Sequence, residues 1–227
     1  MDAKQAVDRL RSMGDPKAVE GMDRFGIQSS NSFGVSVPKI RTLAREVGRD
    51  RLLALKLCET GLHDARLLAS MVDDPEQVTI DQMDRWVRDF DSWDVVDGSC
   101  GNLFDKTPFA VAKAREWCKR REEFVKRAGF VLMAELAVHD KRAKDKLFID
   151  FLPLIIAGAS DERNFVKKAV NWALRQIGKR NLKLNRAAVS TAIKIQRMDS
   201  GAAKWVASDA LRELKSPQVQ KRLRENK

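Results

Sequence analysis

Apolar residues recur along this 227-residue chain with the spacing of about 3.6 residues that one face of an α-helix requires. Alternation of apolar and polar residues, which would indicate strands, is almost absent. The pattern therefore predicts an all-α protein. The predicted helices are Ala3–Met13, Pro38–Val47, Arg51–Glu59, Asp64–Val72, Ile80–Phe90, Trp93–Phe104, Phe109–Cys118, Glu122–Val138, Lys144–Ile156, Glu162–Ile177, Asn185–Ile195, Gly201–Leu214 and a short tail helix after Pro217.

Residues at several helix boundaries favour starts and stops. Ser92 is a candidate N-cap for the helix that follows it, and Pro38 lies at a first-turn position. Gly158 and Gly178 are candidate helix stops. The stretch Gly14–Val37 is rich in Ser, Asn and Gly, so we expect loops there.

About a dozen short helices joined by short polar links fit antiparallel helix pairs stacked side by side. No strict repeat of about 34 or 40 residues is visible. A degenerate HEAT-like array, which is a superhelical α-solenoid with a long concave surface, is therefore the predicted architecture. We expect residues 1–227 to form one such domain.

Charge is distributed unevenly along the chain, whose net charge is +11. Residues 1–100 hold 14 Lys/Arg and 18 Asp/Glu, a balance of −4, whereas residues 101–227 hold 29 and 14, a balance of +15. The strongly basic C-terminal part predicts a polyanionic partner. Nucleic acid is the favoured partner, and an anionic membrane surface is the second candidate. A helical protein that is merely basic is the alternative.

Several functional classes lack support in the sequence. The sequence contains no run of about 18 apolar residues, so no membrane span is predicted. The mixed-charge N-terminus is unlike a signal peptide. The three cysteines lack CxxC spacing and the chain has two histidines, which argues against a zinc site and for reduced thiols in the cytoplasm. Motifs for NTPases, dinucleotide binding, zinc proteases and α/β-hydrolases are absent, so no cofactor is expected.

The first candidate site is the sequence WDVVD at residues 93–97. On a helix Trp93 and Asp97 are one turn apart, so their side chains are neighbours. Gly98 and Gly101 flank Asp97 and weaken a helix by about 1 kcal/mol each relative to alanine. The room they leave would let another backbone or a ligand approach closely. Alternatively, the tryptophan belongs to the core and the acids are first-turn residues favoured by the helix dipole.

A second candidate is the helix Glu162–Ile177. Apolar residues cover one half of it, Lys168, Arg175 and Lys179 form a basic stripe on the other side, and Trp172 lies between. A tryptophan bordered by cations is a pairing that nucleic-acid surfaces use. Alternatively, the tryptophan is half-buried at a helix interface and the cations are simply solvated.

The third candidate is Arg127 in the helix Glu122–Val138. This helix is apolar almost all round, which predicts that it is buried and central. A charge in its second turn is costly unless it reaches solvent, a partner or a phosphate. The forked donors of arginine suit phosphate, so Arg127 is a candidate phosphate contact.

Four segments together resemble the AlkD family of DNA alkylation-repair glycosylases. Their order and helical setting agree with that family over most of the chain. The segments WDVVD and FVKKAVNWALR are fairly specific in combination, whereas either alone would be weak evidence for the family. The segments are WDVVD at 93–97, VKRA at 125–128, FVKKAVNWALR at 165–175 and FGVSVPKIR at 33–41.

The resemblance implies a superhelical array of HEAT-like repeats with a basic concave face, acting on double-stranded DNA that carries alkylated bases. It implies that Asp97 is the catalytic carboxylate and that Trp93 and Trp172 lie beside the lesion. Two positions depart from the family: Ser36 replaces a Gln and Phe25 replaces a Tyr. The residues expected to hold the DNA backbone are Arg127, Lys168 and Arg175.

The expected reaction is hydrolysis of the N-glycosidic bond of N3- or N7-alkylpurines by a monomer. Alkylation makes the base cationic and hence a good leaving group. A carboxylate stabilises the oxocarbenium-like sugar and can orient water, while indole faces attract the cationic base. Whether the base is flipped stays open. Two alternatives are a non-catalytic HEAT-like scaffold that binds nucleic acid and a solenoid whose basic part binds an acidic protein.

Overall fold

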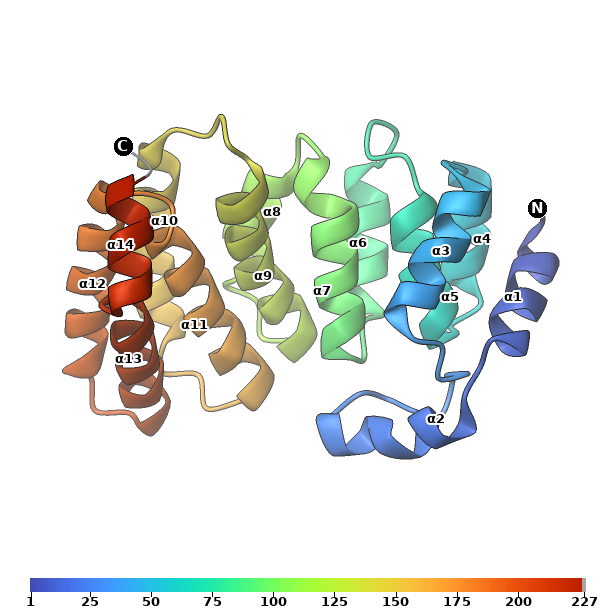
Figure 1. Ribbon diagram of the computed structural model, residues 1–227, viewed down its shortest axis with the longest axis horizontal. Coiled ribbons are helices and arrows are strands. Elements are labelled where there is room, and N and C mark those ends of the chain that lie inside the picture. The colour runs from blue at the N-terminus through green and yellow to red at the C-terminus, as the bar shows by residue number, and fades with distance from the viewer. Residues whose placement is uncertain (226–227) are drawn as a thin grey trace. The chain divides into compact units, whose positions relative to one another are not determined.

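The computed structural model describes residues 1–225, whose regular elements are all helices and which contain no strand (Figure 1). The all-α prediction is confirmed. The chain divides into two compact units, unit 1 (Met1–Pro108) and unit 2 (Phe109–Lys227). None of the helices within residues 1–225 combines the length and apolar character needed to cross a membrane.

Unit 1 contains seven α-helices and two 3-10 turns, and its predicted helices agree with the structure to within two residues at each end. The α-helix that the sequence did not predict is α2, and the two 3-10 turns were not predicted either. The elements are α1 (Ala3–Ser12), α2 (Pro16–Met22), η1 (Asp23–Phe25), α3 (Val37–Val47), α4 (Arg51–Glu59), α5 (His63–Val72), α6 (Ile80–Arg88), α7 (Trp93–Asn102) and η2 (Phe104–Lys106).

Unit 2 also contains seven α-helices in its described part. Here too the predicted bounds agree to within two residues, except that α12 begins three residues earlier than predicted. The helices are α8 (Ala110–Trp117), α9 (Glu123–His139), α10 (Asp145–Gly158), α11 (Asn164–Gly178), α12 (Leu182–Gln196), α13 (Gly201–Leu214) and α14 (Pro217–Glu225).

The stretch Gly14–Val37, expected to consist of loops, contains the short helix α2. Asp15 caps this helix, because its carboxylate accepts a hydrogen bond of 3.0 Å from the backbone amide of Lys17, and Pro16 occupies the first turn. None of the residues of α2 is buried. The helix therefore buries no apolar face of the kind that a periodic pattern reveals, and the expectation of loops throughout was wrong.

In unit 1, α3, α5 and α7 pack as a row of neighbouring helices. At the start of α5, His63 contacts Asp94 at the start of α7, with 2.8 Å between Nε2 and Oδ2. Further along both helices, Asn102 donates a hydrogen bond of 3.1 Å to the Ser70 hydroxyl. Because the first turns of α5 and α7 contact each other and so do their last turns, the two helices run parallel.

In unit 2, α9, α11 and α13 form a similar row. Near the starts of α9 and α11, Arg127 donates a hydrogen bond of 2.6 Å to the Phe165 carbonyl. Just beyond the end of α11, Arg180 donates one of 2.6 Å to the Ala137 carbonyl near the end of α9. These two helices are therefore parallel, as the second helices of successive antiparallel pairs would be.

The sequence separation between partners in these rows varies. It is 31 and 32 residues between α5 and α7. In unit 2 it ranges from 35 to 43 residues. The chain is thus a series of helix repeats of unequal length, which explains why the sequence shows no strict period.

Gly158 and Gly178 end α10 and α11 as predicted, but close packing is the reason. Neither residue has the positive φ of a left-handed cap. A Cβ atom at Gly158 would lie 2.3 Å from the Phe130 ring, and one at Gly178 would lie 2.6 Å from Leu214. Neighbouring helices therefore occupy the space that any larger residue would need.

Candidate functional site

Trp93 and Asp97 lie one turn apart on α7, and each is partly exposed. The indole Nε1 of Trp93 donates a hydrogen bond of 2.9 Å to the backbone carbonyl of Phe25, at the end of η1. The residue Phe25 as a whole is 70% exposed. Since Phe25 makes this contact through its backbone, having Phe rather than Tyr there does not affect it.

Asp94, between these two residues, belongs to a hydrogen-bonded network. It accepts hydrogen bonds from the His63 ring, at 2.8 Å, and from the Ser92 hydroxyl, at 2.5 Å. Burial raises the pKa of Asp94, but the hydrogen bond and charge of His63, together with Ser92, outweigh burial and leave that pKa below its ordinary value. Ser92 is the N-cap residue by position, yet its hydroxyl donates to Asp94 instead of accepting from the backbone.

His63 was not among the predicted site residues. It is buried, and its Nε2 atom holds the carboxylate of Asp94 at the start of the helix that carries Asp97. No pattern in the sequence indicates this contact, because the two residues are 31 positions apart and on different helices.

Gly98 follows Asp97 and faces α5. A Cβ atom at Gly98 would lie 2.8 Å from a terminal methyl group of Leu67. The room left by this glycine is therefore used by a neighbouring helix, the close approach that is one of the two expected uses of this room. Its role is to let α7 approach α5 closely.

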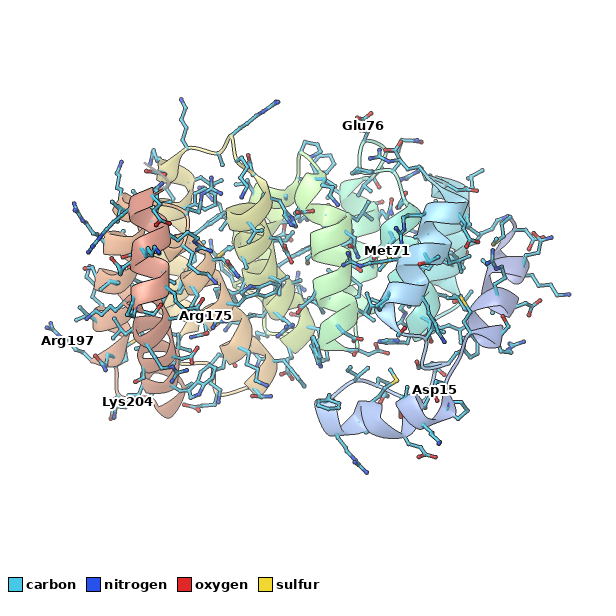
Figure 2. The ribbon with its side chains drawn as sticks, in the orientation of Figure 1. Asp15, Met71, Glu76, Arg175, Arg197 and Lys204 are labelled. Atoms are coloured by element: carbon cyan, nitrogen blue, oxygen red, sulfur yellow. The ribbon has the colours of Figure 1, made fainter. Side chains whose placement is uncertain are left out.

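Unit 1 also contains a basic cavity that the sequence analysis did not identify. It encloses about 440 Å³, and no acidic residue occurs among its described lining residues. Arg41 is the last residue of the segment FGVSVPKIR, which is the one signal that the sequence offered. The lining comes from α3, α5 and α7 and consists of Arg41, Ala44, Arg45, Met71, which is labelled in Figure 2, and Asn102.

On α11, Lys168 is exposed, whereas Trp172 and Arg175 are partly buried. Arg175 (Figure 2) has two acidic partners on α13: its Nη1 atom lies 2.5 Å from Glu213 and 3.6 Å from Asp209. These carboxylates compete with any phosphate for the guanidinium. The role of Arg175 as a phosphate contact stays a prediction.

The third cation of this stripe is also paired. Lys179 Nζ lies 2.6 Å from Glu213 Oε1. Burial raises the pKa of Glu213, but Lys179 and Arg175 outweigh it and hold that pKa below its ordinary value. Lys168 is thus the exposed cation of the stripe.

Arg127 is buried, with 5% of its surface exposed, and α9 is the buried helix that the sequence predicted. Its hydrogen bond of 2.6 Å to the Phe165 carbonyl gives the buried charge a polar partner inside unit 2. Arg127 therefore joins α9 to α11, and its contact with DNA phosphate stays a prediction.

The predicted site residues form two groups, one in each unit. Trp93 and Asp97 are together on α7 of unit 1. The structure brings the others together along α9 and α11 of unit 2: Arg127, Lys168, Trp172 and Arg175.

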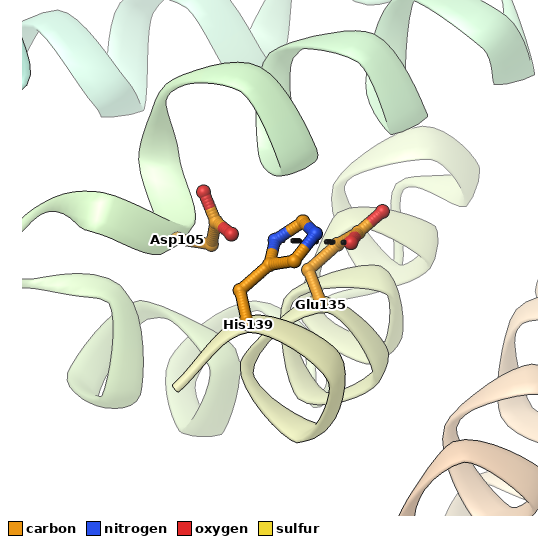
Figure 3. A group of neighbouring side chains, drawn as sticks. All are labelled: Asp105, Glu135 and His139. Carbon is orange, nitrogen blue, oxygen red and sulfur yellow. Dashed lines mark ion pairs between the residues drawn. The ribbon is translucent and has the colours of Figure 1, made fainter. Parts of the chain in front are cut away.

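Glu135 and His139 lie one helical turn apart on α9 and form an ion pair, with 3.5 Å between the Glu135 carboxylate and His139 Nδ1 (Figure 3). Asp105, drawn with them, belongs to unit 1. One helix thus supplies two potential ligands, whereas zinc sites take three or four from the protein. The expectation of a chain without a metal stays a prediction.

Comparisons with known proteins agree with this structure. Residues 6–214 match the family model described as DNA alkylation repair enzyme. A solved structure described as belonging to "a new family of proteins related to the HEAT-like repeat DNA glycosylases with affinity for branched DNA structures" is similar, with a TM-score of 0.78 and 20% identity over 94% of this chain and 96% of that one. This likeness confirms the predicted HEAT-like fold.

An engineered protein also matches, with a TM-score of 0.39 and 16% identity over 88% of this chain and 97% of that one. No match was found among curated proteins.

Proposed function

The chain belongs to the family of DNA alkylation repair enzymes, and we propose that it is a DNA glycosylase that removes cationic alkylated purines from duplex DNA. The observation that carries the proposal is the placement of Asp97 and Trp93 one turn apart on α7, both partly exposed. This pairing offers a carboxylate and an aromatic ring to the same substrate, in the segment that resembles the catalytic helix of AlkD.

The two side chains suit the two charges of the reaction. An N3- or N7-alkylated purine is cationic, and the face of an indole attracts a nearby cation by about 0.5–2 kcal/mol. As the glycosidic bond breaks, positive charge develops on the sugar, and a fixed carboxylate stabilises it. Asp97 can also orient the water that attacks the sugar. Trp93 thus favours the alkylated base over its neutral parent, and Asp97 accelerates bond cleavage.

Cationic surfaces in each unit support DNA binding. Lys168 is exposed on α11 beside Trp172, and Arg41 and Arg45 line the basic cavity of unit 1. Each cation that neutralises a phosphate releases counterions, so affinity for duplex DNA should fall steeply with salt.

The decisive experiment is single-turnover release of a methylated purine from duplex DNA by the wild-type protein and by Asp97→Asn. The substitution keeps the shape and removes the charge, so the rate should fall by about a hundredfold or more. Affinity for DNA should be unchanged or slightly higher, because a negative group is removed from the vicinity of phosphates. An Asp97→Asn protein that works at the wild-type rate would refute the assignment.

The matched control is Asp89→Asn. Asp89 follows α6 in the same unit and is exposed. Its substitution removes the same charge and should leave the rate unchanged. Asp94→Asn is a poorer control, because Asp94 is held by His63 and Ser92 and its loss would disturb the start of α7.

A second candidate function is binding of branched DNA without base excision. The similar structure is of a protein described as having affinity for branched DNA structures. Competition between a four-way junction and a duplex of equal length separates the candidates. A strong preference for the junction, no base release and an inert Asp97→Asn substitution would favour the second. An acidic protein partner would instead leave both DNAs unbound at moderate salt.

A further inference from the structure

Unit 2 contains a cavity of about 440 Å³ beside the ends of α9 and α11 and the helix α14. No carboxylate occurs among the described residues that line it. Two apolar residues of α9 complete the lining. The polar residues are four cations and two amides: Lys141, Lys179, Arg180, Arg222, Gln176 and Asn181.

Arg180 is the most firmly held of these cations. Its guanidinium stacks on the Phe148 ring, 4.1 Å from the ring centre, and donates hydrogen bonds to the carbonyls of Ala137 and Asp140 at 2.6 and 2.9 Å. These acceptors are neutral oxygens. Burial lowers the pKa of Arg180, although Asp140 and Asp145 oppose that effect. The partly buried charge of Arg180 would therefore gain from an anion.

The other three cations are compensated to different degrees. Lys179 is paired with Glu213 at 2.6 Å. Arg222 is exposed and donates one long hydrogen bond, 3.4 Å, to the Lys179 carbonyl. Lys141, in the link after α9, is also exposed. Glu213 thus compensates Lys179, and Asp140 and Asp145 act on Arg180 through their charge.

A purely structural role accounts for part of this cluster. Arg180 and Arg222 bond carbonyls near the ends of α9 and α11, where a cation also suits the helix dipole. Asn181 also has a structural role, since it caps α12 and donates a hydrogen bond of 2.8 Å to Asp145. Capping does not require Lys141, however. Two exposed cations, Lys141 and Arg222, at an open volume indicate a ligand.

We propose that this cavity binds a phosphate group. The forked donors of arginine and the point charge of lysine are the protein groups that best match phosphate oxygens. A cavity of a few hundred cubic ångströms accepts a ligand about the size of a mononucleotide. The phosphate can come from a DNA strand or from a free phosphomonoester. This site is independent of Asp97, so it stands or falls apart from the proposed base excision.

The test compares two double variants of the full chain that lose the same charge. The cavity variant is Lys141→Ala with Arg222→Ala. The control is Lys146→Ala with Lys221→Ala, whose side chains are 82% and 79% exposed and do not line the cavity. All four side chains are exposed, so both variants should fold, which thermal melting would verify. Calorimetry measures binding of inorganic phosphate and adenosine monophosphate, and fluorescence anisotropy measures binding of duplex DNA at several salt concentrations.

The result identifies the source of the phosphate. If the cavity holds a DNA phosphodiester, the cavity variant should bind duplex DNA about fivefold more weakly than the control, with a salt slope smaller by about one. If it holds a free phosphomonoester, the wild-type protein and the control should bind phosphate or adenosine monophosphate, and the cavity variant should lose about tenfold or more in that affinity. The proposal is overturned if the two variants bind DNA equally and the wild-type protein binds neither small phosphate compound.

Discussion

The two units contain similar rows of parallel helices, but the charged side chains that hold neighbouring segments together differ in sign. They are mainly acidic in unit 1 and mainly basic in unit 2. In unit 1 the anchors are acids: buried Asp64 accepts hydrogen bonds from the amides of Phe33 and Val35 at 2.7 and 2.8 Å, and Asp94 accepts one from His63. In unit 2 the anchors are mostly cations that bond carbonyls and carboxylates on a neighbouring helix. Both choices satisfy polar groups at helix ends, so the same architecture accepts either sign.

This difference between the units explains part of the uneven distribution of charge along the chain. Unit 1 holds 15 Lys/Arg and 19 Asp/Glu, and unit 2 holds 28 and 13. Arg127, Arg175 and Arg180 are each bound to a neighbouring helix. Part of the surplus positive charge of unit 2 therefore stabilises its fold, whereas Lys168 is exposed to a polyanion.

The largest effect should come from the acidic anchor of unit 1. Asp64 is 1% exposed, and its carboxylate bonds two backbone amides and the Ser32 hydroxyl. Asp64→Ala should lower the free energy of unfolding by about 4 kcal/mol, since two buried amides lose their partners. Urea unfolding measures it, with the exposed Asp81→Ala as control. A loss below about 1 kcal/mol would contradict the anchoring role.

Arg127→Ala should cost slightly less, about 3 kcal/mol, because it removes a charged hydrogen bond and the packing of a long buried side chain. The exposed Lys168→Ala should change stability by less than about 0.5 kcal/mol. Chemical denaturation of both variants checks the contrast. Equal effects would mean that cations do not anchor the helices of unit 2.

Acid should weaken unit 2 through Asp161, which binds Arg163 and Lys126 at 2.7 and 2.8 Å. The hydrogen bonds from Arg163 lead in holding the pKa of Asp161 below its ordinary value, with Lys126 adding to them against the effect of burial. A depressed pKa stabilises the fold above the unfolded value, about 3.9, and that contribution is lost as pH falls through the folded pKa.

Asp161→Asn should therefore cost about 1–2 kcal/mol at pH 7. The difference from the wild-type protein should shrink steadily as the pH falls below about 4. Urea unfolding at several pH values measures this. A difference that stays constant from neutral pH down to pH 2 would show that the charge of Asp161 is not what stabilises the fold.

The smallest effect concerns DNA affinity and separates exposed from paired cations. Lys168→Ala should weaken duplex binding a fewfold at any sequence and lower the salt slope by about one. Arg175→Ala should change the slope less, because Glu213 and Asp209 already partner this residue, but should destabilise unit 2 by about 1–2 kcal/mol. Salt titrations of DNA binding and unfolding curves, measured for both variants, distinguish the two roles. A larger slope change for Arg175→Ala would place that arginine on phosphate.

The helices and their bounds were predictable because most helices here bury one apolar face, and the period of that face is written in the chain. The short helix α2 was missed because it buries no residue and is defined by Asp15 and Pro16 alone. The array of helix pairs was predictable from short links between short helices. Its repeat length was not, because the contacts between successive helices span 31 to 43 residues.

The sequence by itself determined the all-α fold and the placement of Trp93 and Asp97 one turn apart on one helix, because both depend on residues close together in the chain. It also determined the family, because the four segments that carry the resemblance are each short and local. The tertiary structure alone decided that His63 holds Asp94, that Gly98 makes room for Leu67 and that α13 carries the acids that pair with Arg175. Those contacts join residues about 30 to 40 positions apart on separate helices. Only the folded backbone fixes which side chains meet, and hence which charges stabilise the protein and which are exposed to a ligand.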